Sequence, residues 1–314
     1  MKHQKKIKIT YLTESTMPKL VLIMTLIISL FFLSACQNQQ TETSSSIDSY
    51  TDSLGNKVEI SQTPGRVISL SPAITEILFA LELENTIVGT TDFCDYPEAA
   101  NLTPKVGGFN TPNMELIVDS EPDIIFISSG VQAELSETFK KLNLQTFALD
   151  ASTVEGVIFN IRLLGDIMNA TDQAENIASD MEQRMAYITN KVKGLEAPLV
   201  FFEVWDDPLL SAGPNTFIHN IIELSGAKNF AADFSSDYPQ ISIESLIDRD
   251  PDIYIAVDHK SSMVIADRPG YSALQAIQNQ RYYRVHDDYV TLPGPRIIKG
   301  LEVVAEIVHP DIFR

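Results

Sequence analysis

The chain has 314 residues, 44% of them hydrophobic, which is enough for two domains that each bury a core. Its 42 acidic residues outnumber the 23 basic ones, so the net charge is −19 and no nucleic acid is expected as a partner. The sequence holds two cysteines, which excludes a disulfide-rich scaffold.

Residues 1–35 are predicted to be a lipoprotein signal peptide. The apolar run from Val21 to Ser34 is too short to span a bilayer comfortably and fits a secretion signal. It is followed by Ala35 and Cys36, and small residues before a cysteine are typical of a lipobox. Cys36 is therefore expected to become the lipid-carrying first residue. The alternative is a plain signal peptide, or a membrane anchor with an incidental cysteine.

Residues 36–63 are predicted to be a tether and a small hairpin. The tether is polar and low in complexity, and Tyr50 to Ile60 has a Gly-Asn turn between strand-like residues. Removal of residues 1–35 takes away five lysines and one glutamate, which changes the net charge from −19 to −23. The chain starts at Met1 or Met17, since Met17 also suits the start of a signal peptide.

An N-terminal α/β lobe is predicted over residues 64–170. Residues 66–70 form its first strand, residues 73–83 a helix, and Ile87 begins the next strand. Loops at the carboxyl ends of parallel strands bind ligands in open α/β sheets. The loops after the strand that begins at Ile87 are rich in aromatic residues: Phe93, Tyr96 and Phe109.

Residues 171–195 are predicted to form one long connecting helix. We expect Thr171 to cap its first turn and Gly194 to end it in the left-handed conformation. Its apolar residues recur at steps of three and four, which places them on one face: Ile177, Met181, Met185, Ile188, Val192 and Leu195. The alternative is an ordinary surface helix of a single domain.

A C-terminal α/β lobe is predicted over residues 196–314. It begins with a strand from Leu199 to Trp205, has a helix over residues 218–224, and ends with a helix over residues 297–308. Aromatic and polar side chains crowd the last strand and the loop before Pro-Gly-Pro-Arg: Tyr282, Tyr283, His286 and Tyr289.

The two lobes repeat each other. Asp-Tyr-Pro occurs at residues 95–97 and 237–239, and a Pro-Asp-Ile unit opens an apolar run in both halves. Glu115 and Glu244 each precede the proline of that unit by seven residues, and Asn113 or Ser242 suits the cap of the helix. Strands that alternate with helices predict parallel sheets with helices on both faces. Chance similarity between two common turns is the alternative.

No catalytic grouping is found. The sequence lacks a Gly-rich phosphate loop with Lys-Ser, a GxSxG elbow and a His-Glu-x-x-His pair. The histidines are scattered, so no metal site is predicted, and His286 is expected to be a structural or surface residue. We therefore predict a tethered binding protein and not an enzyme, with a surface enzyme or adhesin as the alternative.

Several motifs resemble the substrate-binding lipoproteins of ABC importers for cobalamin and ferric siderophores, and the cobalamin branch is the most similar. These motifs are RVISLSPAITEILFAL, VGTTDFCDYP, NMELI with PDIIF, YPQIS with DPD, and LPGPRI, and they span residues 64–310. The resemblance implies the class III periplasmic binding fold, with two Rossmann-like lobes joined by one helix. It also implies a ligand in the cleft, a dimeric ABC permease as partner, and a lipid anchor on the extracytoplasmic face of the cell membrane.

The resemblance also implies which side chains bind the ligand, expected to be cobalamin or a related corrinoid. They are Phe93, Phe109, Trp205, Tyr238, Asp288 and Tyr289. A corrin is a large, mostly apolar disc, and aromatic rings bury much area against such a ligand. Phe109 and Trp205 are expected to face each other across the cleft. No arginine clamp for an anionic siderophore is seen, since Arg296 is expected to be structural, but a ferric siderophore or haem is the alternative ligand.

Glu115 and Glu244 are predicted to dock the protein on its transporter. Both lie in the first turn of their helices at the same offset in the repeat, so two identical permease subunits could each bind one of them. The resemblance implies the same role for these two positions. Stabilisation of the helix dipole alone is the alternative.

Overall fold

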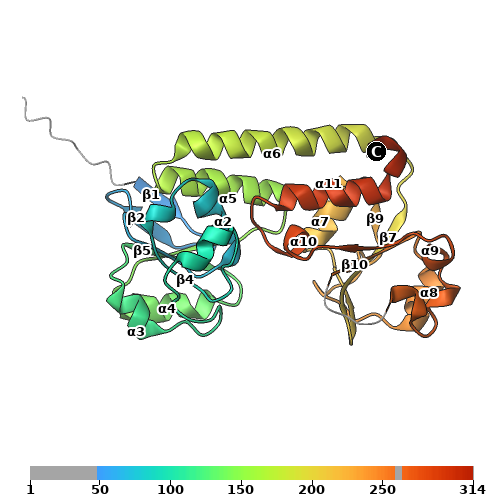
Figure 1. Cartoon of the computed structure of the whole chain (residues 1–314), viewed down its shortest axis with the longest axis horizontal. Coiled ribbons are helices and arrows are strands. Elements are labelled where there is room, and N and C mark those ends of the chain that lie inside the picture. Colours follow the sequence, from blue (N-terminus) through green and yellow to red (C-terminus); the bar gives the residue numbers. More distant parts are fainter. Residues whose placement is uncertain (1–47, 259–263, 314) are drawn as a thin grey trace, which may run out of the picture. The chain divides into compact units, whose positions relative to one another are not determined.

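The computed structural model describes residues 48–258 and 264–313 (Figure 1). Residues 47–314 form one compact unit, which contains both predicted lobes. The predicted signal peptide, Cys36 and the tether up to residue 47 lie outside the described residues. Across the described ranges, no helix combines the length and the apolar character that a membrane crossing requires.

The predicted hairpin is confirmed. Strands β1 (Asp48–Thr51) and β2 (Lys57–Ile60) pair in antiparallel fashion. The Asp52 carboxylate accepts hydrogen bonds from the backbone amides of Leu54 at 3.0 Å and Asn56 at 2.7 Å, which fixes the turn. The amide of Ser53 donates to the carbonyl of Ala148 at 2.9 Å, so the hairpin is attached to the N-terminal lobe.

The N-terminal lobe has a parallel four-stranded sheet in the order β4-β3-β5-β6. Its strands are β3 (Val67–Ser69), β4 (Ile87–Thr90), β5 (Ile124–Ser128) and β6 (Thr146–Leu149). Alternate residues of β5 point to opposite faces of the sheet and pack in different cores. Phe126 packs with helices α2 (Pro72–Ala80) and α5 (Val154–Ile167). Ile125 and Ile127 pack with helices α3 (Met114–Asp119) and α4 (Ala133–Lys141). Short 3₁₀ turns cover Glu84–Thr86 and Glu98–Leu102. Helices therefore cover both faces, as predicted.

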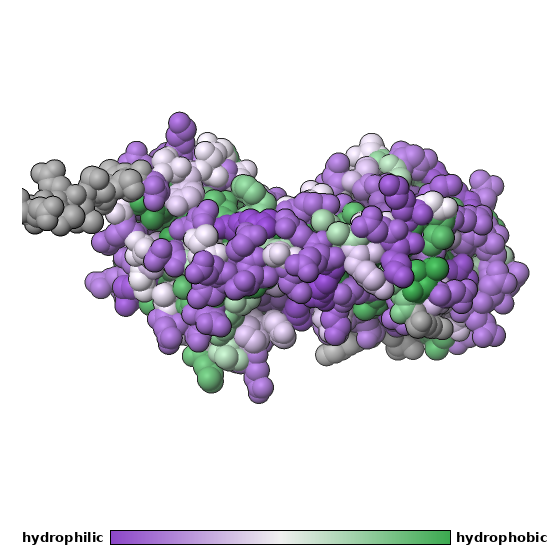
Figure 2. Space-filling view, turned by 90° about the horizontal axis from the view of Figure 1, so that it is seen from above, coloured by the Kyte–Doolittle hydropathy of each residue, from purple (hydrophilic) through white to green (hydrophobic). Residues whose placement is uncertain are grey.

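Helix α6 (Thr171–Val192) is the predicted connecting helix and packs along α5. Gly194 has the predicted left-handed conformation, with φ of 82°. The predicted Thr171 cap is wrong: Ala170 is the cap residue, and the Thr171 hydroxyl instead donates to the Asp166 carboxylate at 3.2 Å. The prediction that Leu195 continues the apolar face is wrong, because α6 ends at Val192 and Leu195 is exposed. Hydrophilic residues dominate the molecular surface on the α6 side (Figure 2).

The C-terminal lobe has a sheet in the order β11-β10-β7-β8, with β9 (Lys228–Asn229) paired to β7. Strands β7 (Leu199–Asp206), β10 (Ile253–Val257) and β11 (Tyr282–Val285) are parallel. The sheet is not wholly parallel, because the turn after Asp206 returns the chain as the antiparallel strand β8 (Leu209–Ser211). Every residue of β10 is buried, as expected for a central strand covered on both faces.

Two layers of helices cover this second sheet. One layer contains α7 (Phe217–Leu224), α10 (Asp288–Thr291) and α11 (Ile297–Val308). The other contains α8 (Ile243–Arg249), α9 (Gln275–Gln278) and the 3₁₀ turns Ile265–Asp267 and Tyr271–Ala273. The chain ends with α12 (Pro310–Phe313). Helix α11 has the predicted bounds.

One hydrophobic core runs through both lobes. It joins residues of both sheets to the helices α2, α5, α6, α7 and α11, which lie on one side of the sheets (Figure 1). Two smaller cores, one in each lobe, lie on the opposite faces of the sheets. Since packed cores resist deformation, we expect the two lobes to move little when a ligand binds.

The repeat has the same contacts in both lobes. Asp123 accepts hydrogen bonds from the amides that precede β3, at 2.8 Å from Gly65 and from Arg66. Asp252 accepts one at 2.7 Å from the amide of Leu199, at the start of β7. The aspartate of each Pro-Asp-Ile unit therefore fastens the beginning of the neighbouring strand. The residue before each proline has a positive φ, 43° at position 121 and 41° at position 250. The two units therefore share their backbone geometry as well as their sequence pattern.

Candidate ligand-binding cleft

The predicted aromatic residues lie at, or follow, the carboxyl ends of strands. Phe93 and Phe109 follow β4, Trp205 lies near the end of β7, and Tyr289 lies in α10, after β11. Phe93, Trp205 and Tyr238 are 62%, 46% and 52% exposed, whereas Phe109 and Tyr289 are partly buried. Large exposed aromatic side chains on loops are typical of a ligand-binding surface.

A buried glutamine fixes the position of Phe109. The side-chain amide of Gln132 donates to the carbonyls of Leu70 at 2.7 Å and of Phe109 at 2.8 Å, and its oxygen accepts from the amide of Ser128 at 2.7 Å. Gly107 has φ of 102° in this loop, and a Cβ there would lie 2.9 Å from the backbone nitrogen of Asn113. The loop that carries Phe109 is therefore tightly packed. Sequence analysis missed Gln132, because an isolated glutamine has no periodic or motif signal.

Hydrogen bonds from the Lys105 side chain hold the loop that carries Phe93 and Tyr96. The Lys105 ammonium donates to the carbonyl of Cys94 at 2.7 Å, to the carbonyl of Ala100 at 3.1 Å and to the hydroxyl of Thr90 at 3.1 Å. Cys94 is a buried free thiol, 3.2 Å from the hydroxyl of Thr75 on α2. These contacts hold the loop against the N-terminal sheet, so its aromatic residues have a defined place.

Trp205 and Tyr238 lie on the C-terminal lobe. The indole of Trp205 donates to the carbonyl of Asp207 at 2.8 Å, which holds the ring at the turn after β7. The backbone amide of Tyr238 donates to the hydroxyl of Ser236 at 3.3 Å. That Phe109 and Trp205 face each other across the cleft stays a prediction.

A buried polar network lies beneath the Trp205 turn. Glu203 accepts hydrogen bonds from the Tyr254 hydroxyl and from the Arg268 guanidinium, whose second bond to Glu203 measures 3.0 Å. Burial, followed by the charge of Glu203, raises the pKa of the Tyr254 hydroxyl, which keeps it protonated. Arg268 also lies 3.8 Å from the carboxylate of Asp206. The network supports the end of β7, and its members Glu203, Tyr254 and Arg268 are buried.

Asp288 and Tyr289 lie together on the short helix α10. The ring of His286 lies 5.1 Å from that of Tyr289 and is tilted by 31°. His286, Asp287 and Asp288 could place ligand atoms within 4.8 Å of one another, as a metal ion requires. Asp288 is however bound to Arg296 at 3.0 Å, and the His286 side chain is mostly exposed, so this group alone does not make a metal site.

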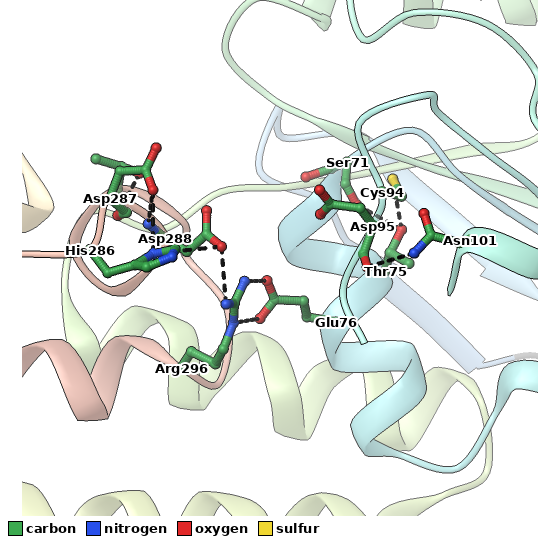
Figure 3. Close-up of polar contacts among 11 residues, drawn as sticks. Ser71, Thr75, Glu76, Cys94, Asp95, Asn101, His286, Asp287, Asp288 and Arg296 are labelled. Carbon is green, nitrogen blue, oxygen red and sulfur yellow. Dashed lines mark hydrogen bonds and ion pairs between the residues drawn. The ribbon is translucent and has the colours of Figure 1, made fainter. Parts of the chain in front are cut away.

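Arg296 joins the two lobes, with the partners shown in Figure 3. Its guanidinium forms two hydrogen bonds with the Glu76 carboxylate on α2, and the Nε–Oε2 distance is 3.0 Å. Burial raises the pKa of the Glu76 carboxyl, although the Arg296 guanidinium opposes part of this shift. The prediction that Arg296 is structural agrees with this contact. Sequence analysis did not identify Glu76 or Asp288 as its partners.

A small crevice lies beside this ion pair, between residues of both lobes. Its volume is about 240 Å³, which is too little for a whole corrin or haem. It is lined by Glu76, Phe79, Ala80, Tyr96, Pro97, Pro295 and Arg296. The crevice therefore marks the seam between the lobes and can hold only part of a large ligand.

The predicted docking glutamates are exposed at equivalent positions of the two lobes. Glu115 lies in the first turn of α3, which Asn113 caps, and Glu244 lies in the first turn of α8. Three residues further on, Val118 is 44% exposed and Ile247 is 38% exposed. An acidic and an apolar side chain are thus presented together on each lobe.

Comparison with known proteins gives a consistent result. The model of the periplasmic binding protein family matches residues 67–289. The uncharacterized ABC transporter substrate-binding lipoprotein YvrC of Bacillus subtilis is 30% identical over 271 residues, which covers 84% of this chain and 86% of YvrC. The crystal structure of the periplasmic vitamin B12-binding protein BtuF of Vibrio cholerae matches with a TM-score of 0.70 at 24% identity, over 79% of this chain and 97% of BtuF. A periplasmic haem-binding protein from Pseudomonas aeruginosa matches with a TM-score of 0.69 at 24% identity, over 79% of this chain and 94% of that protein.

Proposed function

Because the chain belongs to the periplasmic binding protein family and has the class III fold with two α/β lobes, we propose that it captures cobalamin or a related corrinoid for import. Whatever its ligand, the chain is the substrate-binding protein of an ABC importer, and its relatives are solute-binding proteins. The observation that carries the proposal is the set of exposed aromatic side chains at and after the strand ends of both lobes: Phe93, Trp205 and Tyr238.

The chemistry of the loops suits a large, mostly apolar ligand. Phe93, Trp205 and Tyr238 expose between 46% and 62% of their surface, and each ring can bury much area at a small entropic cost. Arg296, beside these loops, is already engaged by Glu76 and Asp288. An anionic siderophore usually requires a cationic side chain, so a corrinoid with amide arms fits better.

Haem or a ferric siderophore is the second candidate. The imidazole of His286 lies beside the phenol of Tyr289, and both side-chain types bind iron in proteins. The haem-binding protein from Pseudomonas aeruginosa also shares the fold.

We propose that the loaded protein docks on a permease dimer through Glu115 and Glu244. The equivalent contacts of the two repeats support this, because two identical permease subunits would meet the same surface twice. The exposed Val118 and Ile247 would add an apolar contact beside each carboxylate. The proposed anchor is a lipid on Cys36, which would keep the protein on the extracytoplasmic face of the cell membrane, and multiple acyl chains would make that attachment stable.

Visible absorption tests the ligand. Residues 47–314, which form one compact unit, would be mixed with cyanocobalamin, haemin or a ferric hydroxamate and then desalted. We expect only the corrin spectrum to be retained. The test variant is Trp205→Ala and its control is Tyr187→Ala, since Tyr187 is 55% exposed, against 46% for Trp205, but lies on α6. Retention of haemin alone would replace the proposed ligand, and a spectrum lost equally in both variants would remove Trp205 from the site.

A further inference from the structure

An ion pair crosses from one lobe to the other at the cleft. The Glu76 side chain, on α2 of the N-terminal lobe, is 3% exposed, and that of Arg296, at the start of α11, is 17% exposed. Both oxygens of the carboxylate are bound by the guanidinium, through Nε and Nη2. A bidentate pair of this kind allows one separation and one orientation of its partners. The pair therefore fixes α2 against the start of α11.

The same guanidinium holds a side chain from each wall of the cleft. Its Nη1 lies 3.0 Å from the Asp288 carboxylate on the C-terminal lobe. Its face lies 3.8 Å from the ring centroid of Tyr96 on the N-terminal lobe, within cation–π range. The turn that precedes Arg296 also packs closely against Glu76. A Cβ on Gly294 in this turn would lie 3.1 Å from the Glu76 carboxylate. Arg296 is thus the common partner of Tyr96 and Asp288.

Stability alone is a weak explanation for this pair. Desolvation of two charges offsets most of their attraction, and well-packed apolar residues often serve stability equally well. Burial raises the pKa of the Glu76 carboxyl, which agrees with a substantial desolvation cost. What an apolar contact lacks is the defined geometry that the fork provides.

We propose that Glu76 and Arg296 are positioning residues that set the spacing of the two cleft walls before a ligand arrives. In this arrangement Tyr96 and Asp288 already have their places, so binding costs less ordering of side chains and lobes. The inference rests on the proposed function only in taking this cleft as the ligand site.

The spacing can be measured without a ligand. Spin labels at Asp119→Cys and Asp248→Cys, exposed and equivalent positions at the ends of α3 and α8, report the distance between the lobes. The unit 47–314 contains one other cysteine, Cys94, which is buried. We expect one narrow distance distribution for the parent and a broadened one for Arg296→Met and for Glu76→Gln.

Arg184 offers a matched control. It forms an equally bidentate pair with Glu302, at 2.7 and 2.8 Å, but this pair joins α6 to α11. Arg184→Met should leave both the distance distribution and the affinity for cyanocobalamin unchanged. Arg296→Lys keeps the charge but not the fork, so it should also broaden the distribution, and it covers the case in which Arg296→Met does not fold.

The affinity for cyanocobalamin completes the test. We expect it to fall at least tenfold in Arg296→Met and in Glu76→Gln, and no further in the double variant, since each change breaks the same contact. A narrow distribution in the folded Arg296 and Glu76 variants would overturn the inference, as would loss of affinity without broadening. Broadening in a protein that does not bind cyanocobalamin would support the positioning role and contradict only the proposed ligand.

Discussion

Replacement of Gln132 by leucine should release the Phe109 loop from the N-terminal sheet. The Gln132 side chain is fully buried and makes three hydrogen bonds, to the backbones of Leu70, Phe109 and Ser128. A net value of about 1 kcal/mol for each bond gives a loss of about 3 kcal/mol in the free energy of unfolding. Backbone groups that stay dry without a partner would add to this loss.

Urea unfolding measures the stability, and titration with cyanocobalamin measures the affinity. Asn160→Leu is the matched control, because within the described residues the buried Asn160 side chain donates one hydrogen bond, at 2.9 Å, to the carbonyl of Asp150. We expect Gln132→Leu to lose about 2 kcal/mol more than Asn160→Leu, which is the difference of two bonds. We also expect only Gln132→Leu to weaken ligand binding in the protein that remains folded.

Two results would refute this reasoning. Equal losses of stability in the Gln132 and Asn160 variants would mean that the bonds of Gln132 are replaced by water. Unchanged affinity in a destabilised Gln132→Leu protein would mean that the position of Phe109 does not matter for the ligand. Gln132→Glu keeps the size of the side chain but removes its donors. An ionised carboxylate can accept the hydrogen bond from Ser128 but cannot donate to the carbonyls of Leu70 and Phe109.

Three further predictions concern charge and attachment. Glu115→Arg combined with Glu244→Arg should abolish uptake in cells while affinity and folding stay nearly intact, because each arginine would then face a permease site that is expected to be basic; full uptake would contradict docking. Cys36→Ser should move the protein out of the membrane fraction, and a variant that stays fully membrane-bound would contradict lipidation. The raised pKa of Glu76 means that the folded state holds its proton more tightly than the unfolded state, so this group favours folding more as the pH falls between the two pKa values. The stability of Glu76→Gln should lack this component, and identical pH profiles by urea unfolding would contradict the shift.

Local sequence signals predicted the scaffold well. Apolar runs after Pro-Asp placed β5 and β10, and the caps Asn113 and Ser242 accept the expected backbone hydrogen bonds. Where prediction failed, a competing contact or turn decided the outcome. The Thr171 hydroxyl bonds to Asp166 instead of capping α6, and α2 ends before Glu82, which has a φ of 60°.

Long-range contacts of the cleft could not be predicted from local patterns. Glu76 and Arg296 are 220 positions apart, and nothing in the helical period of α2 indicates that this glutamate has a buried partner. Gln132 likewise depends on three backbone groups that only the folded sheet brings together. The exposure of Trp205 could be predicted from the sequence, because this residue precedes a turn at the end of a strand.

The surfaces that are repeated in both lobes suit two identical partners, whereas the parts that differ between the lobes suit a single ligand. Asp123 and Asp252 fasten strands in the same way, and the helices that carry Glu115 and Glu244 expose equivalent side chains. The cleft loops differ between the lobes, since Arg296 pairs with Glu76 and stacks on Tyr96. A symmetric permease would therefore bind the repeated surface, whereas a corrinoid, which lacks two-fold symmetry, requires the unlike walls of the cleft. Substitutions on the repeated helices should thus act in pairs on uptake, and substitutions in the cleft should act singly on affinity.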